Sequence, residues 1–392
     1  MILEVRLSNF FSIKEEIVLD MRASDSNSKK NLDLLDNTFK CNDERILKSA
    51  VIYGANASGK SNIIKAIRFC RSMVLSSHLN NENTVFDFSP FKFDEYNKKE
   101  SYFLVKFIIN DIEYEYSFSL TNTEIVREEL YYYPNGRRAK IFARNKKNGK
   151  EKNKIYSFSS AIHKPMDVAE NTSRKTLYIS RASQLDREIP KMIFSFFSNS
   201  FILDYPTLND KEIENLYNQN REHLLKALNM ADSDIVDISL KEGLFFKTFH
   251  KANKDVQFDL MSEESKGTQV LFSLMLVVID IVKNNKVLLI DEIETSLHSK
   301  IVEYIVELFH VSSSAQIIFT THNTSLLNLN KLRKDQIYFV NKKEDGSSDL
   351  YSLFDYKDFR DNMNVEKAYL QGRFDAIPYI DSSLENLRSI VK

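Results

Sequence analysis

Cysteine and glycine are scarce in this chain of 392 residues. Its two cysteines, Cys41 and Cys70, are too few for a disulfide framework or a cysteine-ligated metal site, and they suit a reducing compartment. Glycine occurs only eight times, and two of the eight are close neighbours at Gly54 and Gly59. The segment between these two glycines therefore stands out from the rest of the chain.

The chain also lacks an excess of charge and a long apolar run. A formal net charge of −1 excludes a globally basic nucleic-acid binder, so any contact with DNA must be regional. The longest apolar run, 270–282, is interrupted by Ser273 and Asp280 and is too short to span a bilayer. The first residues, 1–6, alternate in charge and do not form a signal peptide. We expect a globular, cytoplasmic protein without a membrane partner.

The segment around the two glycines matches the phosphate-binding pattern G-x-x-x-x-G-K-[ST]. It follows a buried strand at 50–53 and precedes helix-period apolar residues in 62–77. Glycines let backbone amides wrap around phosphates, Lys60 supplies a cation for the β and γ phosphates, and the Ser61 hydroxyl is a Mg²⁺ ligand. A plain glycine turn before a surface helix is the alternative. The predicted nucleotide-binding residues are Gly54, Asn56, Ala57, Ser58, Gly59, Lys60, Ser61 and Asn62.

A second signal is an aliphatic strand, 287–290, that ends in two adjacent carboxylates, Asp291 and Glu292. At the carboxyl edge of an open α/β sheet such groups face the ligand. We predict that Asp291 holds Mg²⁺ and that Glu292 orients and deprotonates the water that attacks the γ phosphate. The alternative is a capped strand with solvated acids.

Two further segments fit the same chemistry. The strand 316–321 ends at His322, whose imidazole is placed to hydrogen-bond the γ phosphate, although a histidine in such a position is usually structural. Ser265 and the backbone amide of Gly267 lie ahead of the helical run 269–282 and would form another anion-binding end. An ordinary helix cap is the equal alternative for this segment.

Taken in order, these segments resemble the ATP-binding-cassette (ABC) ATPase heads of the RecF, SMC and OLD type. Residues 54–61 match Walker A, 264–268 a degenerate signature motif, 287–292 Walker B, 296–298 the D-loop, and His322 the switch histidine. The turn at 7–13 resembles the N-terminal strand-turn that helps to place the nucleotide base in such heads. More closely, 264–268, 291–298 and the tail 369–378 resemble the AAA15/AAA21 group of bacterial ATPases, found in phage-defence systems such as PARIS and abortive infection L.

This resemblance implies an α/β fold: a mixed N-terminal β-sheet, a parallel P-loop core sheet with flanking helices, an inserted β-arm and a helical region. Alternating residues in 102–109, 112–120 and 125–133 predict the antiparallel strands of the arm. We expect an N-terminal lobe with Walker A at 1–80, the β-rich arm at 81–158, a mostly helical insertion at 159–258, and a C-terminal lobe at 259–392.

The chain departs from the pattern of these heads at two points. No glutamine precedes Gln184, so the Q-loop glutamine is missing and residues 86–93 occupy its place in the order of segments. Lys266 stands in the signature where a small residue is common. From these two departures we expect slow ATP hydrolysis.

In heads of this type, each composite site takes Walker A and Walker B from one subunit and the signature from another. The chain has one full set, which implies a homodimer or higher oligomer held by ATP, with Ser265 and Gly267 touching the γ phosphate that Lys60 of the mate holds. A hexameric AAA+ motor is the competing architecture. That motor would need an arginine finger and a lid instead of a signature helix.

A basic segment at 137–154 holds nine basic residues and one acid. It could grip DNA or an acidic phage protein that acts as a trigger, although a solvated lysine-rich hairpin is the favoured interpretation.

The residues after His322 are too few for a TOPRIM nuclease and contain no acidic triplet. The resemblance therefore implies an ATPase that acts as the sensor or regulator of an antiviral complex. Its effector would be a separate TOPRIM or RloB-like nuclease. The alternative is a DNA-binding RecF/SMC-like ATPase for repair or chromosome maintenance.

Overall fold

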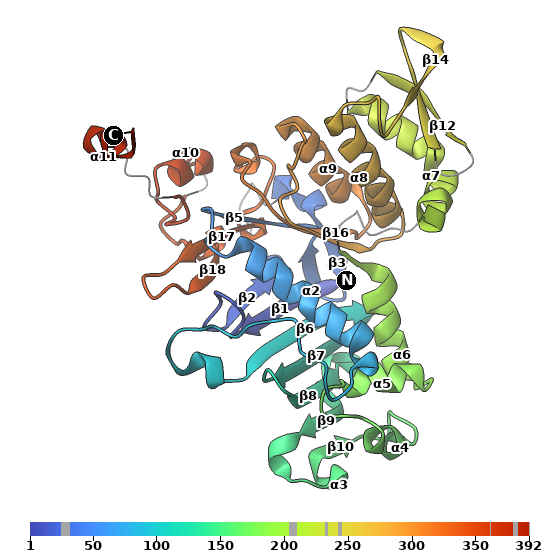
Figure 1. Cartoon of the computed structure of the whole chain (residues 1–392), viewed down its shortest axis with the longest axis vertical. Helices are drawn as coiled ribbons and strands as arrows, with labels where there is room; N and C mark the ends of the chain where they lie inside the picture. The colour runs from blue at the N-terminus through green and yellow to red at the C-terminus, as the bar shows by residue number, and fades with distance from the viewer. Residues whose placement is uncertain are drawn as a thin grey trace.

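Two large β-sheets organise the chain in the computed structural model (Figure 1). The structure describes residues 1–24, 32–203, 210–231, 234–241, 245–360, 362–378 and 383–391. A six-stranded core sheet crosses the middle of the molecule, and a seven-stranded antiparallel sheet lies below it in Figure 1. This is the mixed α/β architecture that the sequence predicts.

The core sheet is parallel except for its last strand, and its central strands are entirely buried. Short aliphatic runs such as 287–290 form it because both of its faces are covered. The strands in spatial order are β11 (Phe201–Leu203), β15 (Val287–Ile290), β16 (Gln316–Thr320), β5 (Ser49–Gly54), β17 (Ile337–Lys342) and β18 (Ser348–Ser352).

Alternate residues of each core strand enter two different hydrophobic cores. On β5, Ala50 and Ile52 pack with α2 and the seven-stranded sheet, whereas Val51 and Tyr53 pack with α8 and α9. This alternation follows from the two-residue repeat of a strand. The helices that flank the core sheet are α2 (Lys60–Ser76), α8 (Lys266–Lys283) and α9 (Ser299–Val311).

The strands predicted as an inserted arm continue the N-terminal sheet. β6 pairs with β1 along its length, so residues distant in sequence share one ladder. The division of the chain at 80, 158 and 258 stays a prediction. The strands in spatial order are β10 (Tyr156–Phe158), β9 (Ala139–Asn145), β8 (Ile125–Tyr132), β7 (Ile112–Leu120), β6 (Ser101–Ile109), β1 (Ile2–Ser8) and β2 (Ile17–Asp20).

The region expected to be mostly helical also contains a small sheet. Residues 245–250 alternate in burial, and this period of two produces a strand where helix was expected. The sheet consists of β12 (Ile235–Lys241), β13 (Phe245–His250) and β14 (Asn253–Asp259), and it stands with α7 at the upper right of Figure 1. The remaining elements are β3 (Thr38–Cys41), β4 (Glu44–Leu47), α3 (Lys152–Ile155), α4 (Pro165–Glu170), α5 (Tyr178–Gln184), α6 (Glu188–Ser195), α7 (Asp210–Met230), α10 (Val365–Leu370) and α11 (Leu384–Val391).

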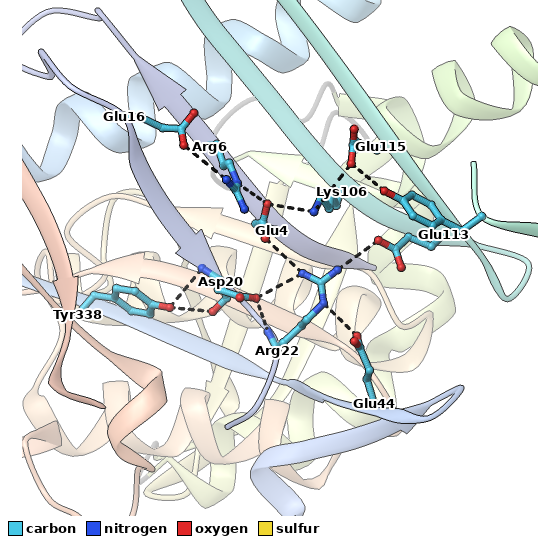
Figure 2. A network of polar contacts seen from close by, with 11 residues as sticks. Glu4, Arg6, Glu16, Asp20, Arg22, Glu44, Lys106, Glu113, Glu115 and Tyr338 are labelled. Carbon is cyan, nitrogen blue, oxygen red and sulfur yellow. Dashed lines mark hydrogen bonds and ion pairs between the residues drawn. The ribbon is translucent and has the colours of Figure 1, made fainter. Parts of the chain in front are cut away.

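A network of polar contacts on the N-terminal sheet reaches the core sheet through Tyr338 (Figure 2). Arg22 forms ion pairs with four carboxylates: Glu4 at 3.4 Å, Asp20 at 3.6 Å, Glu44 at 2.9 Å and Glu113 at 3.2 Å. From the core sheet, Tyr338 donates its hydroxyl to the backbone oxygen of Asp20 at 2.7 Å. The N-terminal sheet is therefore fixed relative to the sheet that carries the phosphate loop.

Glu303 on α9 holds the segment that follows the switch histidine. Its buried carboxylate accepts hydrogen bonds from Lys331 at 2.7 Å and Lys300 at 2.9 Å. Burial alone would raise the pKa of Glu303, but the hydrogen bonds from Lys331 and Lys300 lower this pKa from 4.5 to about 2. A lowered pKa in the folded state means that the carboxylate stabilises the fold above pH 4.5 and loses this contribution as the pH falls toward 2.

Replacing Glu303 by Gln should destabilise the protein by about 1–3 kcal/mol at pH 7, because two cations lose their buried acceptor. The difference from wild type should shrink between pH 5 and pH 3, since the wild-type carboxylate gives up its advantage there. Urea unfolding at several pH values measures both effects. Glu307→Gln is the control: this more exposed neighbour also pairs with Lys331, at 3.3 Å, and its loss should cost less than about 1 kcal/mol. A pH-independent difference for Glu303→Gln would contradict the assignment.

Candidate functional site

Three parallel strands deliver the predicted site residues to one edge of the core sheet. β5 leads into the phosphate loop, β15 leads into Asp291, and β16 lies between them and leads into His322. Because parallel neighbours end at the same edge, residues far apart in sequence meet there. The structure therefore brings Walker A, Walker B and the switch histidine together.

The phosphate loop turns back on itself between β5 and α2. Ala57 and Gly59 have positive φ angles of 61° and 111°, which aim successive amides into the loop. Lys60 is buried, and its ammonium donates to the backbone oxygens of Gly54 at 2.8 Å and Ala55 at 3.0 Å. Burial lowers the pKa of Lys60, while the nearby carboxylates, Asp291 first among them, act in the opposite direction.

Two serines from outside the motif hold the loop in place. Ser348 at the start of β18 donates to the backbone oxygen of Ser58 at 2.6 Å and lies 2.7 Å from the hydroxyl of Ser12. Asn62 donates to the same Ser12 hydroxyl at 2.7 Å. A Cβ atom at Gly59 would lie 2.1 Å from the Ser348 hydroxyl, so only glycine fits there. Sequence reasoning missed Ser348, because nothing near it in sequence marks it.

The acidic turn after β15 is tied to the end of β16. The Thr320 hydroxyl donates to a carboxylate oxygen of Asp291 and accepts a hydrogen bond from the backbone amide of Glu292 at 2.8 Å. Glu292 has a positive φ of 50° and an exposed side chain, so the turn presents it to solvent. Thr320, a second residue that sequence reasoning missed, fixes the carboxylate of Asp291 and the backbone of Glu292.

The residues present fit a magnesium ion held together with a nucleotide. The half-buried hydroxyl of Ser61 lies in the first turn of α2, and the half-buried carboxylate of Asp291 directly follows β15 at the same edge. Mg²⁺ usually takes one or two protein oxygens and fills its shell with phosphates and water. No group of three or more His, Cys, Asp or Glu in the described part of the chain could hold a metal by itself.

The switch histidine is exposed, and its backbone is held from the acidic turn. Glu294, another residue missed from sequence, accepts hydrogen bonds from the backbone amide of His322 at 2.5 Å and the hydroxyl of Thr321 at 2.8 Å. Tyr53 donates to the backbone oxygen of Asn323 at 2.9 Å. The loop after β16 is thus fixed from both neighbouring strands.

The signature segment lies at the start of α8. Ser265 is exposed and caps the helix, accepting from the backbone amide of Thr268 at 3.1 Å. Glu264 is held by His250 at 2.7 Å and by Thr248 of β13. Within the described ranges 54–62 and 262–268, no hydrogen bond or ion pair joins the signature to the phosphate loop of the same chain. Among these described residues, Ser265 therefore bonds Thr268 of its own helix and not the phosphate loop.

Aromatic rings occupy the place of the missing Q-loop. Phe88 stacks on Phe10 at 6.0 Å and approaches Phe69 at 5.1 Å, and Phe86 and Phe91 are buried, so these rings pack into the core while Asp87 and Lys92 stay exposed. A groove of about 530 Å³ runs beside α2 from the turn at Phe11. Its lining includes Phe10, Phe11, Lys65, Phe69, Met73 and Phe86.

Four of the nine basic residues in the segment 137–154 pair with acids outside it. Arg138 pairs with Glu115 at 2.6 Å, Lys147 pairs with Glu100 at 2.6 Å, and Lys146 pairs with Glu124. Arg144 is buried and donates to the backbone oxygen of Thr176 at 2.7 Å. These partners favour the solvated hairpin over a surface that grips DNA.

Comparison with known proteins agrees with this geometry. The model of the AAA_21 family, described as "AAA domain, putative AbiEii toxin, Type IV TA system", matches residues 49–328. The chain belongs to this family. The match confirms the ABC-type ATPase head of the AAA21 group that the motifs predict. None of the curated proteins compared with the chain matches it.

Solved heads of SMC proteins resemble this AAA_21 chain at low identity. The SMC head domain from Thermotoga maritima is 15% identical, with 90% of this chain and 98% of that chain covered and a TM-score of 0.43. An SMC head bound to the C-winged helix domain of ScpA is 17% identical, with 94% and 99% covered and a TM-score of 0.44. The Smc head domain with an extended coiled coil bound to the C-terminal domain of ScpA, derived from Pyrococcus furiosus, is 16% identical, with 100% of both chains covered and a TM-score of 0.42.

A membrane span is not found among the helices of the described residues, since none of them is both long enough and apolar enough.

Replacing Ser348 by Ala should weaken nucleotide binding about 3- to 10-fold. The backbone oxygen of Ser58 then loses its hydrogen-bond donor, and the phosphate loop is no longer held against β18. Titration with a fluorescent ATP analogue measures the Kd. Ser347→Ala is the control, since the Ser347 hydroxyl bonds Asp345 rather than the phosphate loop. An unchanged Kd for Ser348→Ala would show that the loop does not need this contact.

Proposed function

We propose that this chain binds and slowly hydrolyses ATP at a site that a second copy of the chain completes. One observation carries the proposal. Lys60, Asp291 and Glu292 lie at one edge of the core sheet, whereas Ser265 and Gly267, at the start of α8, form no hydrogen bond with the described phosphate loop of their own chain. The set of groups needed around a triphosphate is thus divided between two surfaces of one chain.

Each residue then has a defined task. The amides of 56–61 and the Lys60 ammonium bind the β and γ phosphates, and Ser61 and Asp291 would hold Mg²⁺. When bound, this ion neutralises the charge that develops on the phosphates. Glu292 orients a water molecule and takes its proton as the water oxygen attacks the γ phosphorus and ADP leaves. His322 donates to the γ phosphate and thereby distinguishes ATP from ADP.

A closed pair of chains would supply the missing contacts. The exposed start of α8 presents the Ser265 hydroxyl and free backbone amides, a favourable partner for a phosphate bound by another chain. Because each chain carries one full set, a two-fold pair closes two identical sites. Hydrolysis removes the γ phosphate that both chains share and so opens the pair.

We further propose that the opening and closing of this pair control a separate effector protein in an antiviral, abortive-infection system. The description of the family names a toxin of a type IV toxin–antitoxin system, which supports a role in a two-component system. The paired charges of the segment 137–154 direct the proposal toward a protein partner rather than DNA.

Mixing two inactive variants tests the divided site. Lys60→Ala removes the phosphate cation, and Ser265→Arg blocks the trans contact, so each variant alone should keep less than about 5% of wild-type ATPase activity. A mixed pair contains one intact site, and random exchange of chains should restore roughly a quarter of the wild-type rate. The assay is phosphate release before and after co-incubation.

The control for this mixing assay is Ser262→Arg, which alters an exposed serine ahead of the helix start and should stay active. Full activity of Ser265→Arg alone, or no recovery although mass spectrometry shows mixed pairs, would contradict a shared site.

Purification from the native host tests the regulatory role. A tagged wild-type chain should retain a second protein in a stoichiometric complex. Added ATP should change the amount of that protein retained, because closure of the pair changes the surface that the partner binds. The opposite result is a chain that purifies alone and whose ATPase rate rises several-fold with DNA ends. That result would support the repair or chromosome-maintenance alternative.

A further inference from the structure

Glu294 occupies a position between the acidic turn and the switch loop that the proposed mechanism does not use. Both of its carboxylate oxygens are engaged by the loop after β16. One accepts the backbone amide of His322 at 2.5 Å, and the other accepts the hydroxyl of Thr321 at 2.8 Å. Two hydrogen bonds from one planar carboxylate fix both the distance and the orientation of the two segments.

The rest of the switch loop is arranged around this contact. Thr321 is fully buried, and its hydroxyl accepts the backbone amide of Asn323 at 3.0 Å while it donates to Glu294. The direction of the Asn323 backbone is set from the other side by the Tyr53 hydroxyl at 2.9 Å. The backbone on both sides of His322 is therefore held, while its side chain is exposed.

Glu294 also stands at the root of the D-loop. Its backbone oxygen accepts the amide of Leu297 at 2.8 Å, and Ser296, which has a positive φ of 63°, follows in the same tight turn. A Cβ atom at Gly267 would lie 3.3 Å from the backbone oxygen of Ser296. This turn therefore contacts the start of α8 through Ser296 and the switch loop through Glu294.

We propose that Glu294 is the positioning residue for His322: its carboxylate sets the place of the switch histidine and transmits to it any displacement of the D-loop. This inference rests on the proposed function, because it concerns the hydrolysis step of the same site. Glu294 itself acts through the backbone of His322 and the hydroxyl of Thr321. It is not the general base, a task that belongs to Glu292.

The geometry makes the charge of Glu294 essential for this role. A carboxylate accepts at both oxygens, whereas a glutamine accepts at one and carries two N–H donors at the other. In Glu294→Gln an N–H donor faces either the His322 amide, which cannot accept, or the buried Thr321 hydroxyl, which can accept it only if its own proton gives up its present acceptor; the shape of the side chain is conserved. A displacement of about 1 Å in a group that acts on the transition state can lower a rate about 100-fold.

The test is a double-mutant cycle on the purified full chain. Glu294→Gln should lower kcat for ATP about 10- to 100-fold, change KM less than about threefold, and move the Tm by less than about 3 °C. His322→Ala should lower kcat by a similar or larger factor. If Glu294 acts through His322, the double variant should be no slower than His322→Ala, because the histidine that Glu294 positions is already absent.

Glu307→Gln, which changes a more exposed glutamate on α9, is the matched control and should leave kcat unchanged. Fully multiplicative effects of the two substitutions, or a rise in KM in place of a fall in kcat, overturn the inference while the proposed function stands. A wild-type chain that does not hydrolyse ATP overturns both. Glu294→Asp separates geometry from charge: the shortened side chain cannot reach both partners, so its kcat should stay below wild type, and a full return to the wild-type rate would also overturn the two-bond positioning.

Discussion

The packing of the phosphate loop against Ser12 and Ser348 is the constraint on which the rest of the site depends. Between β5 and α2 the backbone must turn sharply enough to aim its amides inward, and the hydroxyls of Ser12 and Ser348 leave room at Gly59 for a hydrogen atom only. The loop therefore joins three parts of the chain: the N-terminal turn, the core strand β5 and the late strand β18. Movement of any one of them would move the amides that face the phosphates.

Two networks of side chains hold the frame around this loop. The Arg22 cluster of Figure 2 fixes the N-terminal sheet, and with it the turn that carries Ser12, relative to the core sheet. On the other side of the loop, hydroxyls and carboxylates join the ends of β15 and β16 through Thr320 and Glu294. Polar contacts thus fix the backbone around the site. The two hydrophobic cores, which alternate residues of β5 enter, hold the sheets together.

The parts of this site that sequence could predict are those whose residues lie close together in the chain. Lys60 and Ser61 follow two glycines at a fixed spacing, and Asp291 follows a short aliphatic strand, so their chemistry is evident without a fold. Ser348, Thr320 and Glu294 act through partners far along the chain, which only the order of strands in the core sheet reveals. The pairing of β1 with β6 also joins residues far apart in the chain, so sequence reasoning did not reveal that the strands of the predicted arm continue the N-terminal sheet. The sequence of the basic segment shows a large excess of positive charge, because its acidic partners are distant in the chain. Glu115 lies on the neighbouring strand β7, and Glu100 precedes β6.

The central claim is that one bound triphosphate is shared by two copies of the chain. A structure of the Glu292→Gln variant with ATP and Mg²⁺ tests it most directly, because loss of the general base should trap the closed state. The account predicts the Lys60 ammonium of one copy and the Ser265 hydroxyl of the other within about 3 Å of the same γ phosphate. A nucleotide enclosed by a single chain, with Ser265 and Gly267 facing away from every neighbouring phosphate loop, would contradict it.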